Sequence, residues 1–347
     1  MTVFHHSNLL DVRASALAAA TQLLDDGDLT WATIDVGFVV AVGFATDRLR
    51  ELFSPSLQHL LVSETTPDLR IVVADSTVLG PHPPLRPDTQ TVARTDSFSI
   101  DDVGAIAVEP NASISALHWQ QQLGVWWLDA VSGCSSWQVS APLRQLLAWW
   151  APRCGKILAH TAIVGDGTRG VMITGEGGAG KSTTTMQCGL DGIRVLSDDY
   201  CIMTPGAPPD SRPVARAATR CCKLSDDSLA LLGNHVGTLD NSHRLTPGEK
   251  NLVYLPVDGP DAAPTELEIV AVVVPSIGTE TTATLHQTQG SAALSSLAMS
   301  SIFQFNADPA AVLRSCRQIV EHLPTYELHL GSDLSSASAR IAELLNT

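Results

Sequence analysis

The sequence predicts an α/β protein with a mixed α/β amino-terminal domain, residues 1–140, and a second α/β domain, residues 141–347. Two observations support this prediction. At 347 residues the chain exceeds the length that one hydrophobic core usually serves. From Cys154 onward, short apolar runs alternate with glycine turns and helical segments, which is typical of strand–helix units in α/β folds.

In the first domain, residues 14–24 are rich in Ala and Leu and contain no helix breaker, so they predict a helix. Residues 30–45 combine β-branched residues with a glycine break and predict strands. Residues 69–75 and 104–108 predict further short strands. Four prolines within residues 76–94 predict a loop. No motif in this domain carries an identifiable chemistry.

The second domain begins with a predicted helix at residues 142–150. The subsequent predicted elements are a strand at 157–164, a turn at 165–170, a strand at 171–174, a helix at 181–190 and a strand at 193–196. After a proline-rich stretch, the pattern predicts a helix at 226–232, strands at 252–255 and 267–274, and helices at 291–302, 309–322 and 332–345.

Tryptophans concentrate ahead of the second domain, at Trp119, Trp126, Trp127, Trp137, Trp149 and Trp150. Large aromatic side chains bury much area, so the simpler interpretation is that they pack between the two halves of the chain. The alternative interpretation is that one of them stacks on an adenine or an aromatic substrate.

Charge and composition exclude several classes of protein. The formal net charge of −15, without any basic run, argues against a nucleic-acid-binding surface. Apolar runs such as residues 269–275 are too short to span a bilayer, and the amino terminus lacks the pattern of a secretory signal. Seven cysteines without metal-type spacing suggest reduced thiols. We therefore expect a cytoplasmic protein that does not bind membranes; homo-oligomerisation is left open.

The strongest motif is a glycine-rich loop that satisfies G-x-x-x-x-G-K-[ST]. It comprises Gly175, Glu176, Gly177, Gly178, Ala179, Gly180, Lys181 and Ser182, followed by Thr183. Such a loop wraps its backbone N–H groups around phosphate oxygens, and the next helix adds the positive end of its dipole. Lys181 then reaches the β- and γ-phosphates, and the Ser182 hydroxyl binds Mg²⁺. The alternative is a glycine-rich turn without a ligand.

An acidic pair, Asp198 and Asp199, follows the next predicted strand. Strand ends at one edge of an open α/β sheet form ligand sites, so we expect the pair to lie beside the loop. One carboxylate would hold Mg²⁺ and the other would take a proton from an attacking hydroxyl. A turn or capping pair is the alternative. His160, in the strand before the loop, is either a core residue or a supporting catalytic group.

Together these residues resemble the bacterial HPr kinase/phosphorylase family, whose fold is similar to that of phosphoenolpyruvate carboxykinase. The family's motif His falls on His160, its loop Lys and Ser on Lys181 and Ser182, and its acidic pair on Asp198 and Asp199. The resemblance implies that Asp199 accepts the proton. It covers about 45 residues closely, and the rest to the carboxyl terminus more loosely. The family's acidic residue after the loop Ser is Thr183 here, and its E-x-R-G-L-G segment has no counterpart, which indicates a branch that does not act on HPr.

The resulting hypothesis is an ATP- and Mg²⁺-dependent kinase whose acceptor is a peptide or protein serine or a small molecule with a hydroxyl. Catalytic roles fall to Asp199, Asp198, His160 and Lys181, and metal binding to Ser182 and Asp198. Lys250 and Arg244 are either transition-state cations or residues of a solvated loop. Two other functions stay open, namely a non-catalytic ATP-binding regulatory module and an NTPase that drives a partner.

Overall fold

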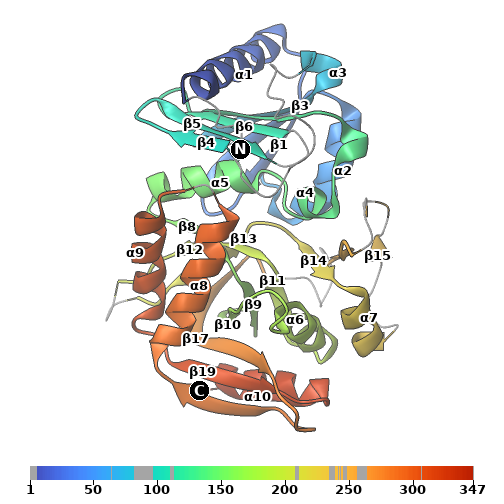
Figure 1. The fold of residues 1–347 in the computed structure, drawn as a ribbon, viewed down its shortest axis with the longest axis vertical. Helices are drawn as coiled ribbons and strands as arrows, with labels where there is room; N and C mark the ends of the chain where they lie inside the picture. The colour runs from blue at the N-terminus through green and yellow to red at the C-terminus, as the bar shows by residue number, and fades with distance from the viewer. Residues whose placement is uncertain are drawn as a thin grey trace. The chain divides into compact units, whose positions relative to one another are not determined.

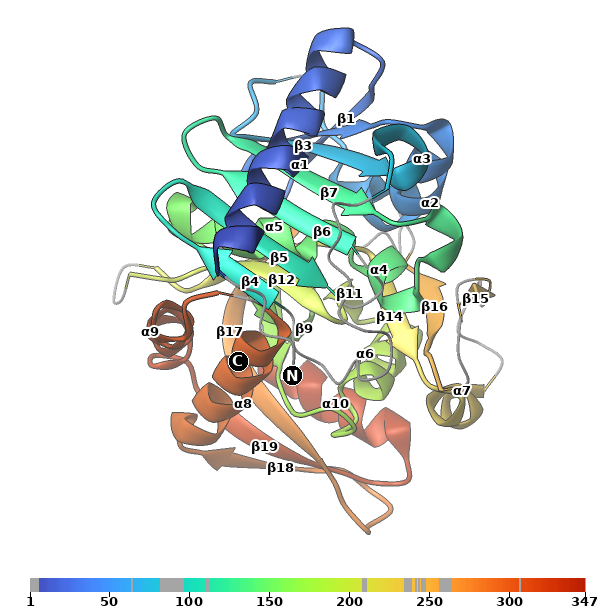
Figure 2. The same ribbon diagram turned by 45° about the horizontal axis from the view of Figure 1, so that its top comes forward.

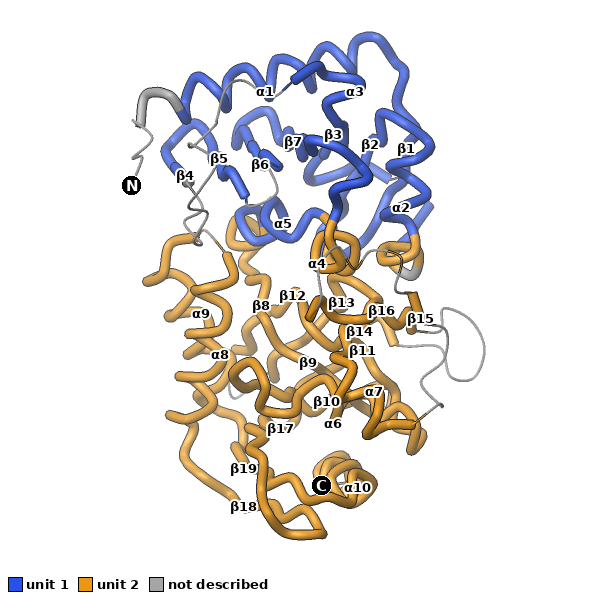
Figure 3. Tube along the Cα trace, turned by 45° about the vertical axis from the view of Figure 1, so that its right-hand side comes forward, with its two compact units in different colours: residues 1–54, 61–134, 143–150 blue, residues 55–60, 135–142, 151–347 orange. Residues whose placement is uncertain are grey.

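The computed structural model describes residues 6–63, 65–81, 97–109, 113–207, 211–233, 239–240, 242, 244, 248–255, 264–305 and 307–346. The chain forms two compact units, shown in different colours in Figure 3. Unit 1 comprises residues 1–54, 61–134 and 143–150, and unit 2 comprises residues 55–60, 135–142 and 151–347.

Unit 1 is built on a sheet whose described strands follow the order β1-β2-β3-β7-β6-β5-β4. The strands are β1 Thr30–Asp35, β2 Val39–Phe44, β3 Leu69–Asp75, β4 Ser97–Ile100, β5 Gly104–Glu109, β6 Ser113–His118 and β7 Leu123–Leu128. The helices that begin in this unit are α1 His6–Asp26, α2 Asp47–Leu57, α3 Ser76–Leu79 and α5 Arg144–Trp150. Strands β2, β3 and β7 pair in parallel, and the other pairs are antiparallel.

Helix α1 supplies the core of unit 1 on one face of this sheet. Figure 2 shows α1 crossing the sheet over β6 and β7. Its Leu9, Ala16 and Ala20 are buried against apolar side chains of β3, β5, β6 and β7. In Figure 1, α5 lies on the opposite face of the same sheet. Burial on both faces explains why the strands read as continuous apolar runs.

Several predictions for this unit need correction. The predicted loop at residues 76–94 begins with the short helix α3, because the Asp75 carboxylate caps its first turn by accepting the Thr77 N–H at 3.1 Å. Residues 82–96 lie outside the described residues. Strands β6 and β7 were not predicted, and α1 begins well before the predicted residues 14–24.

Unit 2 contains a larger sheet whose described strands follow the path β11-β9-β10-β17-β13-β12-β8, with β19 on β17 and β18 on β19. These strands are β8 Ile157–His160, β9 Ala162–Gly165, β10 Arg169–Ile173, β11 Arg194–Ser197, β12 Tyr200–Thr204, β13 Val214–Ala217, β17 Glu266–Ile277, β18 Thr284–Thr288 and β19 Thr325–Leu330. A small separate sheet has the order β14-β16-β15, from β14 Cys221–Leu224, β15 Leu239–Asp240 and β16 Asn251–Tyr254.

Helices cover both faces of the larger sheet. They are α6 Lys181–Leu190, α8 Gly290–Gln304, α9 Pro309–Val320 and α10 Leu334–Leu345, while α4 Ser136–Ser140 and α7 Asp226–Leu232 also belong to unit 2. Figure 1 shows α8 and α9 on one side of the sheet and α6 and α10 on the other. On the α6 side, Val171 and Ile173 of β10 join Ile341 of α10 in one buried apolar cluster.

Two bent strand pairs run through this sheet. β8 continues into β9 after Thr161, and β11 continues into β12 after Asp198 and Asp199. β9 pairs antiparallel with β11, and β8 pairs antiparallel with β12. The segment from β8 to β9 and the segment from β11 to β12 therefore form one ladder, which is interrupted between its two halves. At the interruption, the Thr161 N–H donates to the Asp199 carbonyl at 2.9 Å.

The helices predicted at 181–190, 226–232, 291–302, 309–322 and 332–345 are confirmed as α6 to α10, with the predicted bounds for α6 and α7. The helix predicted at 142–150 as the start of the second domain instead begins at Arg144 and belongs to unit 1. The single strand predicted at residues 157–164 is wrong, because the Thr161 N–H bonds to Asp199 and divides it. Strands β12, β13, β14, β18 and β19 were not predicted. Among the described helices, none is both long enough and apolar enough to cross a membrane.

Candidate active site

The glycine-rich loop connects β10 to α6. Gly178 and Gly180 have φ angles of +87° and +95°, in the left-handed region that glycine adopts without steric cost. Gly180 is the N-cap of α6, and a Cβ atom on it would overlap the Leu330 side chain. The loop is therefore specific for glycine at this position, and it ends at the positive end of a ten-residue helix.

Lys181, the first residue of α6, is buried with 8% of its surface exposed. Its ammonium donates to the carbonyl oxygens of Gly175 at 2.6 Å and Glu176 at 3.3 Å, so the side chain folds back along its own loop. Burial lowers the pKa of Lys181, and the charges of Asp199 and Asp198 oppose this shift. The two carboxylates are therefore electrostatic neighbours of the loop lysine.

The acidic pair lies at the same edge of the sheet as the loop. β9 pairs antiparallel with both β10 and β11, so these two strands run in the same direction and end at one edge. The glycine-rich loop follows β10, and Asp198 and Asp199 follow β11. The structure thus brings the predicted phosphate loop and the predicted carboxylates together.

Asp198 is almost completely buried, with 2% of its surface exposed. Its Oδ2 accepts the Lys223 backbone N–H at 3.2 Å, while Oδ1 has no hydrogen-bond partner among the described residues. Burial and the charge of Asp199 raise the pKa of Asp198, and the Lys223 N–H, the Lys250 charge and a hydrogen bond with Ser182 oppose this shift.

Asp199 has the opposite electrostatic balance. His160 Nε2 lies 2.9 Å from its Oδ1, and the ammonium of Lys223 lies 2.7 Å from its Oδ2. Burial alone would raise the pKa of Asp199, but Lys223 and His160 overcome burial and hold this pKa below its usual range. The pair is thus polarised into one carboxyl that favours its proton and one that favours its charge.

His160 ends β8 opposite Tyr200, which begins β12, and the two rings lie 5.4 Å apart. Helix α8 fixes the main chain here, because Ser301 Oγ accepts the His160 N–H and Ser300 Oγ donates to its carbonyl. Since Nε2 faces an ionised carboxylate, we assign the proton to this nitrogen. Nδ1 has no hydrogen-bond partner within the described residues.

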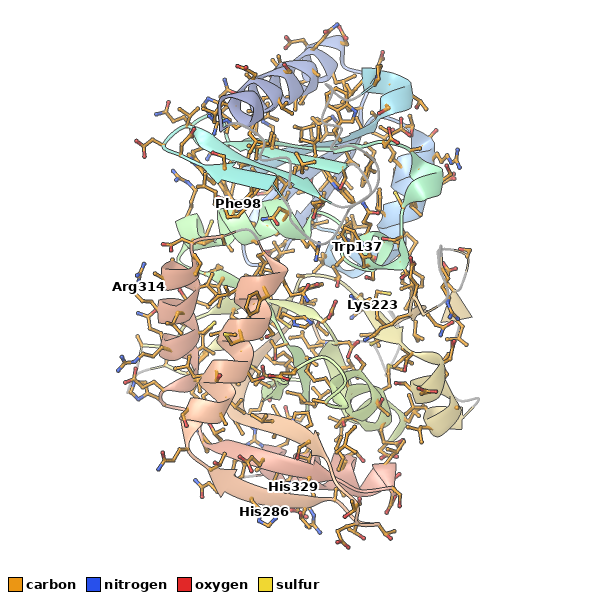
Figure 4. The ribbon with its side chains drawn as sticks, viewed as in Figure 1. Phe98, Trp137, Lys223, His286, Arg314 and His329 are labelled. Atoms are coloured by element: carbon orange, nitrogen blue, oxygen red, sulfur yellow. The ribbon has the colours of Figure 1, made fainter. Side chains whose placement is uncertain are left out.

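Sequence reasoning missed Lys223, which bonds to both carboxylates, through its backbone to Asp198 and through its side chain to Asp199. It lies on β14, which packs against α6, and Figure 4 labels it there. No local motif marks this lysine, because its contacts depend on the placement of the small sheet. The sequence offered one signal for Lys223, namely that it follows the apolar residues Cys221 and Cys222 in a short strand.

The remaining predicted residues lie at the edge of the site or away from it. The Thr183 hydroxyl donates to Ser228 of α7 at 2.9 Å, so its side chain is engaged with that helix. Arg244 forms a bidentate ion pair with Asp226 at 2.9 and 3.0 Å, so its charge is already paired. Lys250 is exposed, and its charge acts on Asp198 and Lys181.

The donor groups at the edge of the sheet fit a divalent cation. Asp198 Oδ1 is a buried carboxylate oxygen without a hydrogen bond among the described residues, and Ser182 lies beside this carboxylate. Mg²⁺ prefers oxygen ligands and is usually bound by one or two carboxylates together with substrate phosphates. In the described part of the chain, no group of three or more His, Cys, Asp or Glu side chains could hold a metal ion. A site of this kind would therefore depend on phosphate oxygens as well.

No protein-family model matches this chain, and no curated protein matches it.

Proposed function

We propose that the chain is an ATP-dependent kinase that transfers the γ-phosphoryl group to a hydroxyl of a peptide, a protein or a small molecule. The observation that carries this proposal is the meeting of Lys181 and Ser182 with Asp198 and Asp199 at one sheet edge. A loop that binds phosphate needs only the first two residues. A buried, ionised carboxylate beside it adds a group that can take a proton from an acceptor.

Each residue has a defined role in the proposed mechanism. Lys181 and the loop N–H groups bind the phosphates and stabilise the charge that develops on them. Asp199 accepts the proton of the acceptor hydroxyl, whose oxygen attacks the γ-phosphorus. The bond from this phosphorus to the bridging oxygen breaks, and ADP leaves with the electron pair. His160 holds Asp199 in place through the 2.9 Å contact.

Asp198 and Ser182 would hold the Mg²⁺ that accompanies the nucleotide. When bound, this ion neutralises charge on the β- and γ-phosphates. Asp198 suits this role because it lies beside Ser182, and a cation there would offset the cost of its buried charge.

A similarity to HPr kinase and to the phosphoenolpyruvate-carboxykinase fold forms part of the same proposal. It rests on the residues named above and on the order strand, glycine-rich loop, helix and acidic pair. A regulatory module that only binds ATP would have no use for a carboxylate held ionised by Lys223 and His160, so this contact favours a catalyst.

The test combines ligand binding with product detection. We expect Mg²⁺ and ATP to stabilise the protein by about 2.7 kcal/mol at a hundredfold excess over Kd, and Lys181→Ala to abolish most of this gain. Mass spectrometry of candidate peptides and metabolites after incubation with ATP should reveal an added phosphate. A thermal shift that Lys181→Ala leaves unchanged would contradict the proposed nucleotide site. Hydrolysis of ATP without any phosphorylated acceptor would favour an NTPase instead.

A further inference from the structure

The Lys223 side chain lies within the candidate active site, and the mechanism described above gives its ammonium no contact with the nucleotide. Its ammonium is 2.7 Å from Asp199 Oδ2, and only 14% of the side chain is exposed. The same ammonium lies 5.7 Å from the centre of the Tyr200 ring, within the range of a cation–π contact. Figure 4 labels Lys223 on β14, the strand that packs beside α6.

Placing a lysine here has an energetic cost. A nearly buried ammonium loses hydration, which its contacts in the site must offset, and its carboxylate partner Asp199 also contacts His160. The strand does not need the charge in order to hold Asp198, because that bond comes from the Lys223 backbone. A nearly buried ammonium beside a pair of carboxylates indicates a functional use.

The balance of charge at the site points to an anion. Within the described residues, the charges of Lys181, Lys223 and Lys250 act on one pair of carboxylates. A site with three ammonium groups for two carboxylates attracts phosphate, and the low exposure of Lys181 and Lys223 strengthens their contacts.

We propose that Lys223 is a second phosphate-binding lysine. It contacts only the terminal, γ-phosphate of a bound nucleoside triphosphate, whereas Lys181 contacts both the β- and the γ-phosphate. This inference rests on the proposed function in one respect, namely that the glycine-rich loop binds the nucleotide.

The position of Lys223 supports the terminal phosphate as its target. The helix and the loop N–H groups would surround the phosphates nearest the loop. The carboxylate pair is an electrostatic neighbour of Lys181, and a proton acceptor must meet the transferred group. Lys223 touches Asp199, so its ammonium lies next to that meeting point. A terminal phosphate there would compete with Asp199 for this ammonium and would leave the carboxylate oxygen accessible to the acceptor hydroxyl.

The experiment compares the affinities of wild type and variants for two ligands, MgADP and the Mg²⁺ complex of an ATP analogue with a nitrogen bridge between the β- and γ-phosphates. Lys223→Met keeps the aliphatic length and removes the charge. Because hydrogen bonds to charged groups contribute about 1.5–3 kcal/mol, affinity for the triphosphate should fall about tenfold or more, while affinity for MgADP changes less than about twofold. Lys181→Met should weaken the binding of both ligands.

Lys156→Met provides the matched control. Lys156 is half-buried, donates to Thr204 Oγ1 at 3.0 Å and precedes β8 at the end opposite His160. This variant should leave both affinities unchanged. If Lys223→Met does not fold, as judged by its melting temperature, Lys223→Gln replaces it, and Lys223→Arg should retain most of the preference for the triphosphate.

The outcomes separate the two proposals. Equal weakening of both ligands by Lys223→Met, or no weakening of either, would overturn the role of Lys223. If wild type binds neither ligand, the proposed function fails together with this inference. If the triphosphate preference depends on Lys223 but no acceptor is ever phosphorylated, the inference stands and the kinase proposal fails.

Discussion

Units 1 and 2 both bury charged side chains, but they balance the charges differently. In unit 1, Arg13 forms a bidentate pair with Asp101 at 2.7 and 2.9 Å. Arg144 lies 3.3 Å from Glu109, whose side chain is only 4% exposed. Each of these acidic groups faces one arginine of opposite charge, and each pair joins two elements of the same unit.

In unit 2, two carboxylates are neighbours in the sequence, and both are buried. The negative charges of adjacent carboxylates repel each other, and the charge of Asp199 is one of the causes that raise the pKa of Asp198. One-to-one pairs serve the stability of a fold, whereas adjacent like charges lower stability and persist where they have a chemical use. The comparison therefore predicts that charge removal affects stability in unit 1 and chiefly activity in unit 2.

The largest expected effect belongs to Asp199→Asn in unit 2. Positioned general bases contribute roughly 10²–10⁴-fold, so single-turnover phosphoryl transfer should slow by that factor while the nucleotide Kd changes little. The melting temperature should fall as well, because the Lys223 contact is lost and removing the repulsion from Asp198 offsets this loss only in part.

Asp198→Asn and His160→Ala are the comparison variants for this measurement. If Asp198 serves the metal, higher Mg²⁺ should partly restore the rate of Asp198→Asn, and His160→Ala should slow transfer less than Asp199→Asn does. Transfer by Asp199→Asn at the wild-type rate would remove the proposed base and favour the binding-module alternative.

In unit 1, Arg144→Met should lower the free energy of unfolding by about 3 kcal/mol, because it leaves the buried Glu109 carboxylate without its cation. Urea unfolding followed by tryptophan fluorescence measures this change. Arg50→Met is the control, since the Arg50–Asp47 pair is exposed and should contribute less than about 1 kcal/mol. Equal effects of the two variants would contradict the distinction between buried and exposed pairs.

The smallest effect concerns pH and Asp101. The hydrogen bonds from Arg13 lower the pKa of Asp101 from 3.8 to about 2. Since the folded state has the lower pKa, the pair stabilises the fold fully above the ordinary pKa and loses this contribution as pH falls from about 4 to about 2.

Asp101 is 30% exposed, so solvent screening should limit this contribution to about 1 kcal/mol or less. The difference in unfolding free energy between wild type and Asp101→Asn should therefore be small at neutral pH and shrink further as pH falls through this window. If the difference in unfolding free energy between wild type and Asp101→Asn grew as the pH fell, the pKa of Asp101 would not be lowered in the folded state.

Local features of the sequence predicted local features of the structure. Helix α6 begins at Lys181 as predicted, because the glycine turn before it acts over a few residues and the left-handed Gly180 is its N-cap. Helix α7 has the predicted bounds because Ser225 caps it by accepting the Ser228 N–H and Gly233 follows its end.

Features that depend on distant pairing were not predicted. The break at Thr161 arises from its bond to Asp199, and the role of Lys223 arises from a contact across 24 residues between β14 and the end of β11. Strand β19 alternates polar and apolar residues, but it is stabilised by β17 and β18, which lie far from it in sequence. Short strands of this kind carry too little intrinsic preference to stand out from their neighbours.

The bond between the Thr161 N–H and the Asp199 carbonyl fixes the backbone of the acidic pair within a buried ladder. Exchange of partners at Asp199 then requires rotation of side chains and no rearrangement of the loop backbone. In the proposed kinase, the backbone of the proton acceptor would therefore need no rearrangement before each substrate binds.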